Sequence, residues 1–82
     1  MAVLRLFASA REAAGTTRVL IEAETVGGVL DQAVAQFGPG FAAVLAICKV
    51  WVNGEPADRP TFVRATDEVA VLPPVSGGAS DT

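Results

Sequence analysis

The residues best suited to take part in chemistry lie near the end of the chain, in the segment from Pro73 to Gly78. Pro73 and Pro74 donate no backbone hydrogen bonds and favour extended geometry, so we expect them to end a strand and direct the chain away from the domain. Gly77 and Gly78 have no side chains and can therefore enter a channel too narrow for other residues. A glycine pair alone is typical of a disordered end. The preceding Pro-Pro-Val-Ser instead favours a tip that is inserted into a partner.

Other common catalytic and metal-binding arrangements are missing from the sequence. The chain has no histidine, so neither a Ser-His-Asp nor a Cys-His arrangement can form. Cys48 is the single cysteine, which leaves a zinc site without its usual ligand spacing. Gly27-Gly28 lacks the Lys-Ser/Thr of a phosphate-binding loop. We therefore expect no bound cofactor and no metal.

Length and composition indicate one folded domain. The chain has 82 residues, of which 51% are hydrophobic and 18% charged, far from the composition of disordered proteins. A net charge of −3 without a basic stripe argues against nucleic acid as a partner. No export signal and no apolar run long enough for a membrane span are found. With one cysteine and no disulfide framework, the expected location is the cytoplasm.

Two strands are predicted in the first quarter of the chain. Residues 3–8 alternate, with Leu4 and Leu6 on one face and Phe7 on the other, and residues 18–23 alternate in the same way. Between them, Ser9 and Glu12 have the spacing of a capping box, and Gly15 is placed to end a short helical turn. The two strands are expected to form a hairpin.

A helix and further strands follow. Thr25 is a plausible N-cap for an amphipathic helix that Gly38-Pro39 ends, and Phe41 and Leu45 suit a short helical or irregular connection. Residues 47–52 are rich in strand formers and run into the turn signal Asn53-Gly54. Pro56 and Pro60 restrict the next segment to an edge strand or loop, and the final strand spans residues 68–72.

One helix and four or five short strands predict an α+β domain, a β-grasp roll with a mixed sheet and the main helix on one face. This domain spans residues 1–72, and residues 73–82 form a tail. The helix should cover one side of each strand, as listed: Leu4, Leu6, Val19, Ile21, Cys48, Val50, Val52, Val69 and Val71. Cys48 is then expected to be an inert core residue.

The opposite face should carry Phe7, Trp51 and Leu72 beside Arg5 and Lys49, a partly exposed apolar patch close to the start of the tail. We interpret it as a docking surface for a protein partner. The alternative is that Trp51 and Phe7 cover each other or a loop. With the tail, the residues predicted to bind partners are Phe7, Trp51, Leu72, Pro73, Pro74, Val75 and Ser76.

The sequence resembles the MoaD/ThiS-type ubiquitin-like sulfur carriers over nearly its whole length, most closely the small subunit of molybdopterin synthase. The matching residues are Leu6-Phe7-Ala8, Arg11-Glu12, the helix after Thr25, Val52-Asn53-Gly54, Asp67-Glu68-Val69-Ala70 and, most specifically, Pro73-Pro74-Val75-Ser76-Gly77-Gly78. This resemblance implies that Gly78 is the reactive residue, with Gly77 beside it. A ubiquitin-activating-like adenylyltransferase would activate the Gly78 carboxylate with ATP, which the partner and not this chain would bind. The resulting thiocarboxylate would enter the large subunit of molybdopterin synthase and donate its sulfur.

The chain departs from this pattern because residues 79–82 follow Gly78. The Gly78 carbonyl is then part of an amide, which has no carboxylate oxygen to attack ATP. We expect a tail-trimming protease to cut after Gly78. Two alternatives stay open: a sulfur carrier for another pathway, such as thiamin, cysteine or a secondary metabolite, and a noncatalytic β-grasp interaction module.

Overall fold

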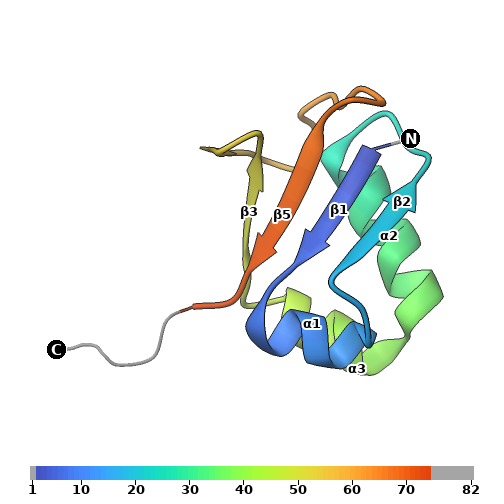
Figure 1. Cartoon of the computed structure of the whole chain (residues 1–82), viewed down its shortest axis with the longest axis vertical. Helices are drawn as coiled ribbons and strands as arrows, with labels where there is room; N and C mark the ends of the chain where they lie inside the picture. The colour runs from blue at the N-terminus through green and yellow to red at the C-terminus, as the bar shows by residue number, and fades with distance from the viewer. Residues whose placement is uncertain (1, 75–82) are drawn as a thin grey trace, which may run out of the picture.

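A mixed sheet organises the part of the chain that the computed structural model describes, residues 2–74 (Figure 1). Its five strands lie in the order β2-β1-β5-β3-β4. β1 is antiparallel to β2 and parallel to β5, and β3 is antiparallel to both β5 and β4. The predicted α+β β-grasp fold is confirmed. In chain order, the elements are β1 (Ala2–Leu6), α1 (Ala8–Ala14), β2 (Arg18–Ile21), α2 (Val26–Phe37), α3 (Pro39–Leu45), β3 (Lys49–Val52), β4 (Glu55–Pro56) and β5 (Glu68–Leu72).

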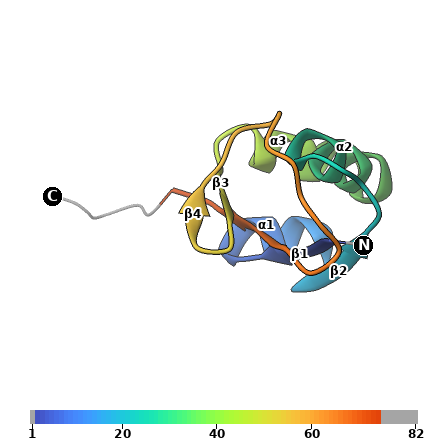
Figure 2. The ribbon, with the colours of Figure 1, turned by 90° about the horizontal axis from the view of Figure 1, so that it is seen from above.

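The core lies between the sheet and the two helices α2 and α3, which cover one side of it (Figure 2). Leu4, Leu6, Val69 and Val71 alternate along β1 and β5 and are buried against these helices, as the alternation predicted. The remaining members of the predicted helix-covered face also lie in this core or pack against it: Val19, Ile21, Cys48, Val50 and Val52. The other side of the sheet carries no helix among the described residues.

Local signals define α2 as predicted. The Thr25 side chain accepts a hydrogen bond from the Gly28 N–H at 3.0 Å, which caps the first turn. At the other end, Gly38 has φ 94° and donates its N–H to the Val34 carbonyl at 2.8 Å. A positive φ is cheap only for glycine, so the helix ends there. Pro39 then starts α3, a short helix that is the first of the two predicted alternatives, a short helical or an irregular connection.

The predicted capping box at Ser9 and Glu12 is wrong. α1 begins at Ala8, and its N-cap is Phe7, which makes no side-chain hydrogen bond to the first turn. The chain enters the helix directly from β1, and the Phe7 carbonyl accepts from the Ala10 N–H at 3.0 Å. Ser9 is therefore already inside the helix. The predicted stop at Gly15 is confirmed, with φ 78°.

The turn after β3 and the edge strand that follows it agree with the sequence. Asn53 and Gly54 have φ of 51° and 87°, the conformation that a tight hairpin turn requires. Pro56 lies in the edge strand β4 opposite Trp51, where its missing N–H breaks no ladder within the described sheet. The short hairpin places Trp51 next to the outermost strand.

Phe41 is the largest side chain that is completely buried, and α3 contributes it to the core. Its ring meets that of Phe37 edge to face, with the centroids 5.3 Å apart and the planes at 61°. A small domain has few such side chains, so we expect this contact at the end of α2 to stabilise the domain.

Replacing Phe41 with alanine should lower the free energy of unfolding by about 3–5 kcal/mol, because the substitution removes a buried ring and leaves a cavity. Phe62→Ala is the matched control, since the Phe62 side chain is 78% exposed. Urea unfolding followed by circular dichroism measures both changes. Equal losses in the two variants would contradict the assignment of Phe41 to the core.

Candidate functional site

The end of β5 is the base from which the tail leaves the domain. Leu72, the last residue of β5, pairs with Lys49 of β3, and Pro73 and Pro74 follow without regular secondary structure. The strand therefore ends at the residue that the two prolines predicted. Four of the predicted site residues lie outside the described part of the chain, so their roles stay predictions: Val75, Ser76, Gly77 and Gly78.

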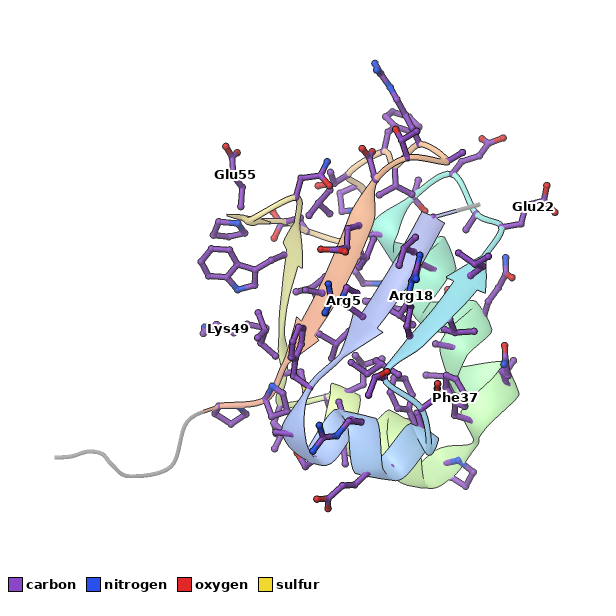
Figure 3. All side chains as sticks on the ribbon, viewed as in Figure 1. Arg5, Arg18, Glu22, Phe37, Lys49 and Glu55 are labelled. Carbon is purple, nitrogen blue, oxygen red and sulfur yellow. The ribbon has the colours of Figure 1, made fainter. Side chains whose placement is uncertain are left out.

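The sheet register brings residues from three strands into one row on the open face. Arg5 of β1 is aligned with Ala70 of β5, and Ala70 is aligned with Trp51 of β3. Leu72 and Lys49 form the next row towards the tail. Trp51 and Leu72 are half-buried, and Lys49, which Figure 3 labels, is exposed. The structure thus places Trp51 and Leu72 on the same face, next to the base of the tail.

Phe7 reaches this face from a different element than predicted. It follows β1 as the N-cap of α1, and its side chain is 37% exposed. The Arg5 guanidinium lies over its ring, 5.6 Å from the centroid, and also contacts the Glu68 carboxylate at 3.3 Å. This cation–π contact with Arg5 restrains the Phe7 ring, and the Phe7 side chain still stays partly exposed. We call the surface formed by Arg5, Phe7, Lys49, Trp51, Ala70 and Leu72 the tail-base patch.

A polar network fixes the start of β5 and thereby its register. Asn53 donates its side-chain N–H to the Asp67 carboxylate at 2.9 Å and accepts from the Glu68 N–H at 2.9 Å. The second Asp67 oxygen accepts from the Arg64 N–H at 2.8 Å. The Asn53 hydrogen bond, followed by that from the Arg64 backbone, lowers the pKa of Asp67 below its usual value. Sequence inspection identified Asn53 as a turn residue and missed this second role.

Gly27 and Gly28 do not form a phosphate-binding loop. The Gly27 N–H donates to the Arg59 carbonyl at 2.8 Å, and the Gly28 N–H donates to Thr25. A Cβ on Gly27 would lie 3.2 Å from the Arg59 carbonyl oxygen. Glycine is therefore favoured there because the loop after β4 packs closely on the first turn of α2.

A groove of about 360 Å³ lies between α2 and this loop on the helix-covered side. Cys48 contributes to its lining and donates its S–H to the Val44 carbonyl at 3.2 Å. Burial raises the pKa of the Cys48 thiol, which opposes thiolate formation. The predicted assignment of Cys48 to core packing agrees with these contacts.

Two exposed apolar side chains were missed by the sequence analysis. Ile47, just before β3, is 63% exposed, and Phe62, in the loop before β5, is 78% exposed. Phe62 lies in no regular strand or helix, so no periodicity could assign it to a face. Ile47 was included in the predicted strand 47–52, but β3 begins at Lys49, so Ile47 precedes the strand that pairs with β5.

No helix within residues 2–74 is long and apolar enough to cross a membrane. The same part of the chain contains no group of three or more Cys, Asp or Glu side chains arranged to hold a metal ion.

Comparison with known proteins gives one family and several solved structures. The model of the ThiS family matches residues 4–78. The crystal structure of small archaeal modifier protein 1 from Haloferax volcanii is 35% identical, covers 94% of this chain and 98% of its own, and has a TM-score of 0.77. The solution structure of small archaeal modifier protein 1 from Methanosarcina acetivorans is 28% identical, with coverages of 94% and 95% and a TM-score of 0.84.

A third solved structure is a complex of subunits 1 and 2 of molybdopterin-converting factor from Helicobacter pylori. Its matching chain is 24% identical, with coverages of 94% and 97% and a TM-score of 0.68, which shows a common fold. The comparison with curated protein sequences found no match.

Asp67→Asn should destabilise the domain at neutral pH more than in acid. Because the folded-state pKa of Asp67 is lowered, its carboxylate contributes stability above the unfolded value of ~3.9, and this contribution is lost as the pH falls through the folded pKa. The gap in urea midpoint between wild type and variant should therefore close well below pH ~3.9.

Asp58→Asn is the control for this measurement, because no hydrogen bond of the Asp58 carboxylate occurs among those found within residues 2–74. Its urea midpoint should follow wild type throughout. If the urea midpoints of wild type and Asp67→Asn differ by the same amount at every pH, the network stabilises the domain through its geometry and not through the charge of Asp67.

Proposed function

The chain belongs to the ThiS family, and from this we propose that it is a sulfur carrier whose Gly78 carboxyl is adenylated, converted to a thiocarboxylate and used in molybdopterin biosynthesis. The family match carries this proposal, since it spans residues 4–78 and stops at Gly78. The last residue that the family model matches is thus Gly78, the glycine that the tail motif singled out.

The chemistry at Gly78 needs no catalytic side chain from this protein. A carboxylate is a poor acyl donor because its leaving group is an oxide. Attack of a Gly78 carboxylate oxygen on the α-phosphate of ATP releases pyrophosphate and gives an acyl adenylate. A hydrosulfide ion then attacks the acyl carbon, AMP leaves with the bonding electrons of the acyl–oxygen bond, and loss of the remaining S–H proton leaves the thiocarboxylate on Gly78. The activating enzyme binds the ATP, and this chain supplies the acyl group.

The domain supports this chemistry by fixing where the tail begins. β5 is hydrogen-bonded on both sides, to β1 and β3, so Leu72 has a defined position. The six residues 73–78 reach roughly 20 Å when extended, enough to enter the active site of an enzyme docked on the tail-base patch. The patch combines apolar Trp51 and Leu72 with cationic Arg5 and Lys49. This composition suits a partner surface with an apolar centre and an acidic rim.

Molybdopterin as the destination of the sulfur rests on the resemblance of the tail motif to the small subunit of molybdopterin synthase. The Helicobacter pylori complex of subunits 1 and 2 shows that a protein of this fold assembles with a second subunit. We propose that a large synthase subunit receives the tail of this chain in the same manner, with the thiocarboxylate as the sulfur donor.

Protein modification is the second candidate function. The small archaeal modifier protein from Haloferax volcanii, at 35% identity over 94% of this chain, favours it. Activation of Gly78 would be the same, but a lysine amino group of a target protein would attack the adenylate and release AMP. The product would be an isopeptide and not a thiocarboxylate. Mass spectrometry of cell extracts distinguishes the two, since only modification leaves Gly78 attached to lysines of other proteins.

Both functions require removal of the residues that follow Gly78. While Ala79 is attached, the Gly78 carbonyl is an amide and offers no oxygen for adenylation. We propose a tail-trimming protease that cuts the bond between Gly78 and Ala79.

Truncation after Gly78 should give a chain that is adenylated and thiocarboxylated without the protease. Deleting Gly78 from this truncated form should abolish sulfur transfer, because the acyl carbon no longer reaches the active centre. Whole-protein mass spectrometry follows the oxygen-to-sulfur mass gain, and circular dichroism checks that the fold is unchanged. Sulfur transfer by the form that lacks Gly78 would refute Gly78 as the acyl site.

Phe7→Asp should weaken docking of the activating enzyme more than it weakens the fold. Loss of one aromatic contact at the centre of an interface costs about 1–2 kcal/mol, so the KM for the truncated carrier in ATP–pyrophosphate exchange should rise roughly tenfold. The matched control is Phe62→Asp, an exposed aromatic outside the patch. Extensive unfolding of Phe7→Asp, or an equal rise in KM for both variants, would refute the patch as the docking site.

A further inference from the structure

The outer edge of β2 is an unpaired strand edge within the described part of the chain. β2 is the first strand of the sheet, and among residues 2–74 only β1 pairs with it (Figure 1). The opposite edge, β4, has only two residues, and one of them is Pro56. By contrast, β2 has four residues and exposes Leu20, whose side chain is 56% accessible. Such an edge is a template for another strand.

The hydrogen bonding of β1 shows which backbone groups of β2 face outwards. The Leu6 N–H donates to the Thr17 carbonyl at 2.9 Å, whereas the Val3 N–H donates to Asp67, on the side of β5. In an antiparallel pair, hydrogen-bonded and non-hydrogen-bonded positions alternate. Given that Leu4 is aligned with Val19 and Arg5 with Arg18, the backbone groups of Val19 and Ile21 face β1. Those of Arg18 and Leu20 therefore face the free edge, and Glu22 follows directly after the last residue of β2.

The side chains along this edge are complementary to themselves. The sequence reads Arg18-Val19-Leu20-Ile21-Glu22, with a cation and an anion equally far from the central Leu20. In an antiparallel pair centred on Leu20, each Leu20 faces the other, and Arg18 of each copy faces Glu22 of the second. The backbone N–H and carbonyl of Leu20 face the free edge. The two Leu20 residues, which meet at the twofold axis, can therefore exchange two backbone hydrogen bonds.

Arg18 lacks an acidic partner within the described chain. It is aligned with Arg5, and Arg5 is paired with Glu68. Two like charges opposite each other on neighbouring strands are destabilising. Figure 3 shows Arg5 and Arg18 side by side on the open face, with Glu22 reaching into solvent beyond the end of β2. Glu22 of a second copy would supply the anion that Arg18 lacks.

We propose that two copies of this protein pair through their β2 edges, antiparallel and centred on Leu20, to form one continuous sheet. The Thr16 hydroxyl contacts the outward backbone groups of Arg18, and Gln32 donates to the Glu22 carbonyl. These bonds compete with the ends of the new ladder, so the dimer is weak and reversible. β1 lies between this edge and β5, the strand from whose end the tail leaves. The dimer therefore goes beyond the proposed carrier function and leaves the tail accessible.

Charge reversal on the full-length chain tests this pairing. Arg18→Glu places two carboxylates opposite each other across the dyad, and Glu22→Arg places two guanidinium groups there, so each variant alone should dimerise at least tenfold more weakly than wild type. When the two variants are mixed, their edges are complementary again, and a heterodimer of near wild-type affinity should form.

Sedimentation velocity up to millimolar concentration measures the self-association, and fluorescence labels on the two variants measure formation of the heterodimer. Arg11→Glu, which changes an exposed arginine on α1, is the control for the change in net charge and should dimerise as wild type.

A wild-type chain that stays monomeric at millimolar concentration would overturn the proposal, even if an extended peptide adds to the same edge. The proposal would also be overturned if either single variant dimerises like wild type, or if mixing the two variants does not restore dimerisation. Thiocarboxylation of the Gly78-truncated form, measured in parallel, should be unaffected by Arg18→Glu. If the wild-type chain dimerises but its Gly78-truncated form is not thiocarboxylated, the proposed carrier function is refuted and the proposed dimer is not.

Discussion

The central position of β5 is the constraint on which the rest of the molecule depends. β5 is the last strand of the described chain, yet it lies between β1 and β3 and is hydrogen-bonded to both. Its inward residues Val69 and Val71 are completely buried. The strand therefore cannot separate from the sheet without opening the core. Whatever follows Leu72 starts from a point that is as rigid as the domain itself, and this is the property that an inserted tail requires.

Features with a local physical cause could be predicted from the sequence. Thr25 caps α2 with its own hydroxyl, and Asn53-Gly54 adopt positive φ because the hairpin turn needs it. The alternation in β5 also placed Leu72 on the open face. The prediction of Ser9 as the N-cap was wrong. The spacing of Ser9 and Glu12 fits a capping box, but α1 begins earlier, directly after β1. The burial of Leu6 at the end of β1 fixed the helix start, and Phe7 became its N-cap.

Features that depend on distant segments could not be predicted. The parallel pairing of β1 with β5 joins the two ends of the domain, and no short-range pattern encodes it. The same holds for the loop carbonyl of Arg59, which satisfies the Gly27 N–H and explains a glycine that sequence inspection had compared with a phosphate loop. For the candidate site, the sequence identified the tail motif and the faces of Trp51 and Leu72. It did not show that Arg5 links Glu68 to the Phe7 ring, because that link depends on three elements meeting.

The described domain places few reactive side chains near the base of the tail, and this suits the proposed role of a protein that carries a reactive group on its tail. A thiocarboxylate is a nucleophile, and an acyl adenylate reacts with nucleophiles, so reactive side chains near the base of the tail would consume the group. The chain has no histidine, its only thiol has a raised pKa, and Cys48 lines the side of the sheet that faces the helices. On the tail-base patch, Lys49 is aligned with Leu72, and Arg5 lies in the neighbouring row, aligned with Ala70. Arg5 is occupied by Glu68 and cannot act as a nucleophile, which leaves Lys49 as the one amine on the tail-base patch. In the function that we propose, recognition and chemistry are thus separated: the tail-base patch would bind the partner, and the partner would supply every reactive group other than the Gly78 carboxyl.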